Sequence, residues 1–126
     1  MILGTGIDIV ETKRIADTLE RFGERFLNRI FLEAEVAYAR SMKTSNLHLA
    51  ARFAAKEAIS KAFGTGIGEQ LGWKDMEIRR RDTGEPYVVM HGRGLDLMKA
   101  RGATTIHVSL SHTESYAAAS AVLEGT

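Results

Sequence analysis

The segment from residue 47 to residue 64, LHLAARFAAKEAISKAFG, constrains the fold more than any other part of the chain. It predicts a long helix, because small and apolar residues fill it without a break and Gly64 offers a C-terminal cap. Apolar residues cover most of the circumference of that helix, and a helix of this kind is usually buried. The sequence therefore predicts an α+β fold in which a small antiparallel sheet packs against this long buried helix.

The remaining segments alternate between strand patterns and helix patterns. Strands are expected at 2–10, 75–82, 86–90, 105–111 and 116–123, and helices at 12–30, 33–41 and 93–101. Gly23 is expected to interrupt the first of these helices, and residues 65–72 form a glycine-rich loop. No repeat or linker divides the chain, so we expect a single domain over 1–126 with its helices on one side of the sheet.

Composition excludes several classes of protein. Seventeen Lys and Arg against sixteen Asp and Glu give a net charge of +1, which is too balanced for binding nucleic acid by bulk charge. The chain has no cysteine, so disulfides and thiolate metal sites are excluded and a reducing compartment suits it. It shows neither a signal peptide nor a stretch of about 20 apolar residues. We expect a cytoplasmic protein without nucleic-acid or membrane partners.

Two carboxylates fall in apolar surroundings. Asp8 lies in the first strand, on the face that also carries two glycines, and Glu57 lies on the long helix. Burying a charge costs several kcal/mol unless it is paired. Mg²⁺ typically takes one or two protein carboxylates together with phosphate oxygens, so the two side chains could share such an ion. Simpler explanations fit equally: Glu57 could pair with Lys61 one turn away, and the glycines could admit another backbone.

Histidine spacing does not predict a zinc site, because none of the four histidines forms an HxxxH or HExxH motif. His112 follows a strand and lies between Ser111 and Thr113, which together resemble a cluster of donors for an anion. A role in stabilising the turn explains the same residues.

An arginine stripe is expected on the helix at 12–30. Its members are separated by seven, four and four residues: Arg14, Arg21, Arg25 and Arg29. The adjoining apolar residues recur at helical spacing and should face the core: Ile15, Leu19, Phe22, Phe26 and Ile30. The stripe is either a solvated amphipathic face or a surface that docks an acidic helix.

Three passages resemble the holo-[acyl-carrier-protein] synthases of the 4′-phosphopantetheinyl transferase family. GTGIDIVETKRI at 4–15 matches the family pattern GxDxxxxxRI, and ARFAAKEAISKAFGTGIG at 51–68 matches FxxKEAxxKA. HVSLSHTESYAAA at 107–119 is similar to the C-terminal serine–histidine strand pair, and the turn at 84–86 fits the family's GxP. The resemblance spans essentially the whole chain, and its second passage is highly specific.

The resemblance implies a reaction. The family transfers the phosphopantetheine arm of coenzyme A to a serine of apo-acyl carrier protein, releases adenosine 3′,5′-bisphosphate, requires Mg²⁺ and supports fatty acid biosynthesis. By this resemblance Asp8 and Glu57 are the Mg²⁺ ligands, and Glu57 and Lys61 are catalytic, with Lys61 on the pyrophosphate. The residues expected to contact the coenzyme are Arg52, Lys61, Gly64, Pro86, His112 and Thr113. The base that takes the serine proton is either Glu57 or a metal-bound water.

The resemblance also implies partners. Acyl carrier proteins are acidic, so the arginine stripe would bind them, with Arg14, Arg25 and Arg29 as first candidates and Arg21 next. Members of the family form homotrimers with active sites between subunits. The coenzyme would then lie between the 47–64 helix of one subunit and the His112 strand end of its neighbour.

Two other functions remain open from the residues. A non-catalytic adaptor could bind acidic partners through the arginine stripe alone. A nucleotide pyrophosphohydrolase could use the same two carboxylates with water as the nucleophile.

Overall fold

The computed structural model describes the whole chain, residues 1–126. The elements run in this order: β1 (Ile2–Glu11), α1 (Thr12–Phe22), α2 (Glu24–Ile30), α3 (Glu33–Arg40), α4 (Ser45–Phe63), the 3-10 turn η1 (Trp73–Asp75), β2 (Met76–Arg80), β3 (Pro86–Met90), α5 (Arg93–Arg101), β4 (Ala103–His112) and β5 (Tyr116–Gly125). The predicted α+β class is confirmed. No helix combines the length and the apolar character needed to cross a bilayer.

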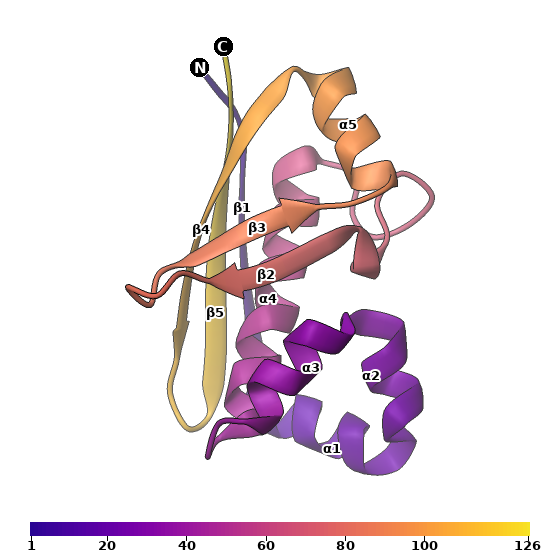
Figure 1. Ribbon diagram of the computed structural model, residues 1–126, viewed down its shortest axis with the longest axis vertical. Coiled ribbons are helices and arrows are strands. Elements are labelled where there is room, and N and C mark those ends of the chain that lie inside the picture. The colour runs from indigo at the N-terminus through magenta and orange to yellow at the C-terminus, as the bar shows by residue number, and fades with distance from the viewer.

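The strands form two sheets rather than the single sheet that was predicted. β5 pairs with both β1 and β4 in an antiparallel sheet of order β1-β5-β4, and β2 pairs only with β3. Figure 1 shows the β2–β3 hairpin crossing the long strands at a steep angle, beside β4. The hairpin therefore packs next to the main sheet without extending its hydrogen bonds.

Helix α4 lies directly against the inner face of the three-stranded sheet (Figure 1). A side chain at Gly6 would place its Cβ 1.9 Å from the carbonyl oxygen of Ala58, and one at Gly4 would place it 2.0 Å from that of Ala62. The two backbones touch because β1 carries no side chain there. The glycines therefore serve the approach of a backbone, and the next inward side chain of β1, Asp8, is brought against α4.

A buried ion pair joins the helical half of the molecule to α4. The Nζ of Lys56 donates to Glu35 Oε1 at 2.7 Å and to the carbonyl oxygen of Ile30 at 2.8 Å. Glu35 also accepts from the backbone amides of Leu32 and Ile78, each at 2.9 Å. Burial lowers the pKa of Lys56, and the charge of Glu35 opposes that shift. The pair connects α2, α3, α4 and β2 at one point.

The predicted core face of the first helix is partly wrong. Ile15 and Ile30 are buried, but Phe22 is 45% exposed and Leu27 is buried although it was not predicted to be. The helix is interrupted at Gly23, where φ is 55°, so α1 and α2 are separate helices. The helical spacing does not continue across that break, and the apolar face of α2 starts anew.

Replacing Gly6 by alanine tests the contact between β1 and α4. We expect Gly6→Ala to lower the free energy of unfolding by about 1–3 kcal/mol, because the added Cβ forces β1 away from the Ala58 carbonyl. Urea denaturation measures this change. Gly68→Ala is the matched control, since a Cβ at Gly68 meets nothing within 4 Å. Equal stability of the two variants would contradict the proposed contact.

Candidate functional site

Three of the predicted site residues come together where β1 crosses α4. Lys61 Nζ lies 3.1 Å from Asp8 Oδ1 and donates to the carbonyl oxygen of Ile7 at 3.0 Å. Glu57 lies one turn before Lys61 on the same helix, and no ion pair joins the two. The simpler explanation, an intrahelical Glu57–Lys61 pair, is therefore wrong: Lys61 reaches across to β1 instead.

The Glu57 carboxylate is influenced by the charges around it, that of Asp8 included. Burial raises the pKa of Glu57, and the negative charge of Asp8 raises it further, while Lys61 and Arg14 act in the opposite direction. A carboxylate whose ionisation is disfavoured by a neighbouring negative charge favours a cation beside it. The chain has no cluster of three or more His, Asp or Glu side chains suited to a metal ion. A pair of carboxylates fits Mg²⁺, which needs only one or two from the protein.

A second group of predicted residues lies on the other side of α4. Arg52 is 1% exposed, and its guanidinium carbon lies 4.3 Å from the centre of the Tyr38 ring. The His48 ring lies beside Tyr38 and also 5.4 Å from the ring of His112, at the end of β4. Arg52 and His112, far apart in the sequence, are thus joined through Tyr38 and His48.

This second group contains several buried side-chain nitrogens that have no hydrogen-bond partner. Arg52 Nε and Nη1, Arg80 Nε and His48 Nδ1 are buried and make no hydrogen bond within the chain. Burial lowers the pKa of His48, and the charges of His112, Arg52 and Arg80 lower it further. We name His48, Arg52, Arg80 and His112 the basic cluster. The unsatisfied buried nitrogens of the two arginines suit an anion with several oxygens.

The sequence singled out Arg52 and His112 but not His48 or Arg80. His48 lies one turn before Arg52 on α4, a signal that helical spacing could have shown. Arg80 is the middle of three consecutive arginines, and the sequence does not show which of the three belongs to a site. Only the pairing of the strands in the β2–β3 hairpin separates it from Arg79 and Arg81.

Within one chain the two groups stay apart. Asp8 lies on β1 and His112 on β4, which are opposite edges of the sheet with β5 between them. Two strand spacings, roughly 10 Å, separate those edges. Gly64 caps α4 three residues after Lys61 and so belongs with the group around Asp8. Pro86 pairs with Arg80 and so belongs with the basic cluster. Each edge therefore carries a different part of the predicted site.

Thr113 takes part in the turn between β4 and β5. Its backbone amide donates to the carbonyl oxygen of Tyr116 at 2.8 Å, and its Oγ1 accepts from the amide of Tyr116 at 3.1 Å. The turn-stabilising role that the sequence left open therefore holds for Thr113, whose hydroxyl remains exposed beside His112.

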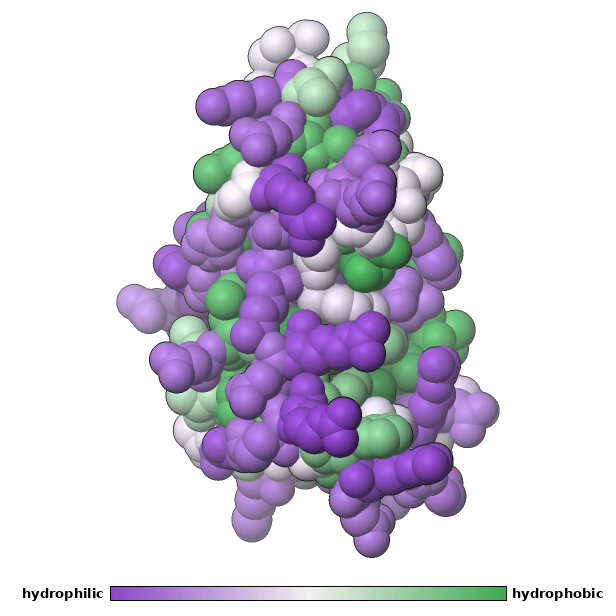
Figure 2. All heavy atoms as spheres, turned by 90° about the vertical axis from the view of Figure 1, so that its right-hand side faces the viewer, coloured by the Kyte–Doolittle hydropathy of each residue, from purple (hydrophilic) through white to green (hydrophobic).

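The arginine stripe is divided by the break at Gly23. Arg25 and Arg29 line a hollow of about 370 Å³ together with Phe22, Phe26 and the only tryptophan, Trp73. Figure 2 shows hydrophobic atoms between strongly hydrophilic side chains in the lower half of the face on which α2 lies.

The other two arginines of the stripe lie outside this hollow. Arg21 is stacked on Phe22, with its guanidinium carbon 5.1 Å from the ring centre. Arg14 is exposed, and its charge acts on Glu57. All four arginines are accessible, but they do not form one continuous row.

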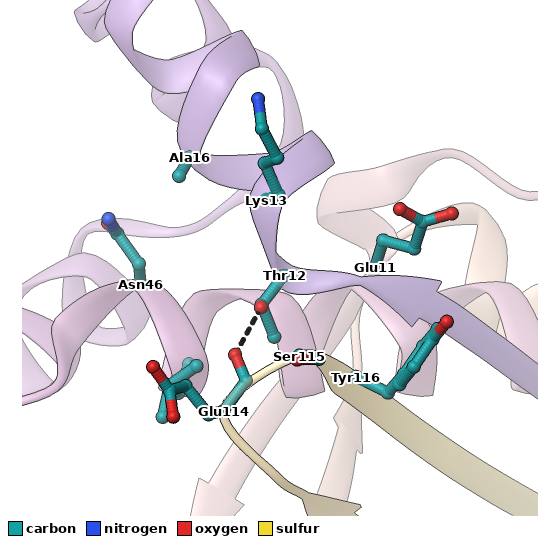
Figure 3. A pocket seen from close by; sticks show the side chains of 9 residues that line it. Glu11, Thr12, Lys13, Ala16, Asn46, Glu114, Ser115 and Tyr116 are labelled. Carbon is teal, nitrogen blue, oxygen red and sulfur yellow. Dashed lines mark hydrogen bonds between the residues drawn. The ribbon is translucent and has the colours of Figure 1, made fainter.

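A further hollow, of about 500 Å³, lies where β1 continues into α1 (Figure 3). The Thr12 hydroxyl donates to the carbonyl oxygen of Glu114 across it, at 2.5 Å. In Figure 3 the side chains of Lys13, Glu11 and Glu114 point in different directions rather than toward one point. None of the predicted site residues lines this hollow.

The chain is similar to known proteins over nearly its whole length. A family model described as the 4′-phosphopantetheinyl transferase superfamily matches residues 4–121. A holo-[acyl-carrier-protein] synthase of Koribacter versatilis is 50% identical over 124 residues, covering 98% of this chain and 99% of that protein.

Solved structures are similar over the same length. A holo-[acyl-carrier-protein] synthase from Neisseria meningitidis superposes with a TM-score of 0.92 at 33% identity, covering 98% of this chain and 99% of that one. One from Bacillus anthracis, in complex with CoA (3′,5′-ADP), has a TM-score of 0.84 at 38% identity and covers 100% and 99%. The chain therefore belongs to the 4′-phosphopantetheinyl transferase superfamily.

Proposed function

We propose that the protein transfers the 4′-phosphopantetheine arm of coenzyme A to a serine of apo-acyl carrier protein and releases adenosine 3′,5′-bisphosphate. The observation that carries this proposal is the meeting of Asp8 and Glu57 between β1 and α4, in a family of phosphopantetheinyl transferases. Its relative from Bacillus anthracis binds coenzyme A, which supports the same coenzyme here. By the resemblance, the reaction belongs to fatty acid biosynthesis in the cytoplasm.

Asp8 and Glu57 are the residues that would hold Mg²⁺. When bound, the ion neutralises charge on the phosphoryl oxygens of the coenzyme. Lys61 has its ammonium beside Asp8, where it can donate to the pyrophosphate and stabilise the leaving group. Gly64 caps the same helix, and by the resemblance it lies beside the coenzyme.

Arg52 and His112 are the residues we assign to the nucleotide and its 3′-phosphate, with Thr113 and Pro86 beside them. The unsatisfied nitrogens of Arg52 support this assignment, because an anion would supply their missing acceptors. The two groups of residues lie on opposite edges of one sheet, so we infer that each active site combines the Asp8 edge of one subunit with the His112 edge of another.

We propose that the assembly is the homotrimer with sites between subunits that the family resemblance implies. The outer face of the sheet supports an assembly, because Ile7 is 70% exposed and Ile9 66% exposed, with Tyr116 beside them. Exposed apolar side chains that form a contiguous patch usually mark an interface.

We place the acidic carrier protein on the hollow lined by Arg25, Arg29 and the phenylalanines. Arginines around an apolar hollow can steer an acidic helix and fix its position. Arg14 and Arg21 extend the charged surface along α1. The adaptor hypothesis uses the same surface but leaves the pairing of Asp8 with Glu57 unexplained.

Mass spectrometry of apo-acyl carrier protein tests the reaction directly. With coenzyme A and Mg²⁺, we expect the carrier to gain the mass of phosphopantetheine. Asp8→Asn and Glu57→Gln should each lower the rate roughly 100-fold or more, because several kcal/mol of charge stabilisation is lost.

Asp17→Asn is the control for this test, since Asp17 pairs with Lys13 on the exposed surface of α1. Release of free phosphopantetheine, with or without carrier, would instead identify a hydrolase. Full activity of both carboxylate variants would overturn the proposed site.

The protonation of Glu57 provides a second test, in the metal-free protein. We expect Asp8→Asn to lower the pKa of Glu57 toward its ordinary value, because a neighbouring negative charge is removed. Lys61→Met should raise that pKa further, because a neighbouring positive charge is removed. The NMR titration of the Glu57 carboxyl carbon measures both. Shifts of equal sign would show that the three side chains are not arranged as described.

The docking surface is tested by reversing one charge. We expect Arg25→Glu to raise the KM for the acidic carrier about tenfold while kcat changes little, because long-range attraction and docking are affected but not the chemistry. The effect should weaken as salt is added. Lys99→Glu on α5, which lies outside the hollow, is the control of equal charge change. An equal response of both variants would rule out a localised surface.

A further inference from the structure

The glycine-rich loop at 65–72 directly follows the turn of α4 that carries Lys61. It begins after the helix cap Gly64 and folds back on the helix, where the Gly66 amide donates to the carbonyl oxygen of Ser60 at 3.2 Å. Gly64 and Gly66 both have a positive φ, of 77° and 65°, which lets the chain turn sharply at this point. The start of the loop therefore lies at the end of α4 that also presents Lys61.

Arg93, the first residue of α5, binds this loop. Figure 1 shows the loop beside the end of α5 at which Arg93 lies. The Nη1 of Arg93 donates to the carbonyl oxygen of Glu69 at 2.7 Å, and its Nε lies 3.2 Å from Asp75 Oδ2. The same oxygen of Asp75 accepts from the backbone amide of Gly72 at 2.8 Å. One guanidinium thus joins the middle of the loop to a residue just beyond its end.

Gly72 leaves open the space that the guanidinium of Arg93 occupies. A Cβ at position 72 would lie 2.4 Å from Arg93 Nη2 and 3.3 Å from Asp75 Oδ2. The φ of Gly72 is −94°, a value that residues other than glycine adopt freely. The close approach of Arg93, and not the backbone conformation, is therefore what requires a glycine here.

The bonds of Arg93 act on the loop more than on the fold as a whole. Its side chain is 55% exposed, and ion pairs at the surface contribute little to overall stability. The loop residues 68–70 are exposed, and the only side chain bonded to their backbone is that of Arg93. On either side of them Leu71 is buried and Ile67 is packed against the core. Without Arg93, this stretch can open locally while the rest of the protein stays folded.

We propose that Arg93 is a positioning residue for coenzyme A: by fixing the loop at 65–72, it holds the backbone that follows Gly64 in the arrangement that receives the coenzyme beside Lys61. This inference rests on the proposed function. Arg93 acts through the loop and does not itself touch the coenzyme. A loop that adopts the receptive arrangement for only part of the time binds its ligand more weakly, in proportion to that fraction.

Two other roles of Arg93 would have different consequences. A residue that only stabilised the fold would change the resistance to urea and leave both KM values of the folded enzyme as they are. A residue that served the carrier protein would act through Trp73, which follows the loop and lines the hollow of Arg25 and Arg29. In that case the KM for the carrier would rise. Separate measurement of the two KM values distinguishes these roles.

The test measures the KM for coenzyme A, the KM for apo-carrier protein and kcat. Arg93→Met keeps the aliphatic stem and removes the donors, so the KM for coenzyme A should rise about tenfold while the KM for the carrier and kcat stay within about twofold. Arg93→Lys can still pair with Asp75 but cannot also reach Glu69, so its KM for coenzyme A should rise less. Hydrogen-exchange mass spectrometry should show faster exchange of the amides at 65–72 in both variants.

Gly72→Ala tests the same contact from the other side. The added Cβ displaces the guanidinium of Arg93, so this variant should also raise the KM for coenzyme A and speed exchange in the loop. In the double variant with Arg93→Met, Gly72→Ala should add little, because the two changes remove one shared contact. Additive effects would overturn the inference.

Lys99→Met is the matched control, because Lys99 is an exposed cation in the last turn of the same helix. We expect it to leave both KM values, kcat and the exchange of the loop unchanged. An unchanged KM for coenzyme A in Arg93→Met would overturn the inference even if the loop exchanged faster. An equal rise of both KM values, in Arg93→Met or in the control, would overturn it as well.

The inference and the proposed function fail in different ways. If the unmodified protein neither binds coenzyme A in a calorimeter nor loads the carrier, the proposed function itself is overturned. If it loads the carrier and the KM for coenzyme A is insensitive to Arg93, the transferase activity stands and the assignment of Arg93 is wrong. Should Arg93→Met not fold, Arg93→Lys and Gly72→Ala give the same comparison.

Discussion

The direct contact between the backbones of β1 and α4 is the constraint on which the rest of the structure depends. Gly4 and Gly6 leave no space between the strand and the helix, so the next inward residue, Asp8, is held against the helical turn that carries Glu57 and Lys61. The repulsion between the carboxylates and the bridge from Lys61 to Asp8 both follow from this closeness. A side chain at either glycine would move Asp8 away from Glu57 and Lys61 without touching any of the three.

The neighbouring residues Lys56 and Glu57 show how one helix contributes to both the core and the proposed site. Lys56 points into the interior, where it is bonded to Glu35 and to the carbonyl oxygen of Ile30, and so positions α2 and α3. Glu57 points to the half-buried side that faces β1. Consecutive side chains of an α-helix point about 100° apart. Two neighbouring residues of α4 can therefore point into the interior and toward β1.

The sequence predicts the elements well because their signals are local: the alanine-rich composition of α4, the alternation in β4 and the glycine at position 23. It predicts distant contacts poorly. The exposure of Phe22 depends on the direction of the chain after Gly23. The pairing of Glu35 with Lys56 joins two helices at residues that are 21 positions apart in the sequence. The meeting of Asp8 with Glu57 was expected from motifs that the family shares. Arg80 and His48 belong to no such motif, and only the folded hairpin and helix bring them together.

The position of Trp73 has a practical consequence. The ring is stacked on Phe53, with 5.0 Å between ring centres, and it lines the hollow that Arg25 and Arg29 flank. No other indole exists in the chain, so tryptophan fluorescence comes from this one wall of the hollow. A ligand that settles there changes the polarity around the ring, and the emission wavelength shifts with it. The molecule thus carries its own optical probe of occupancy at that surface, without a label.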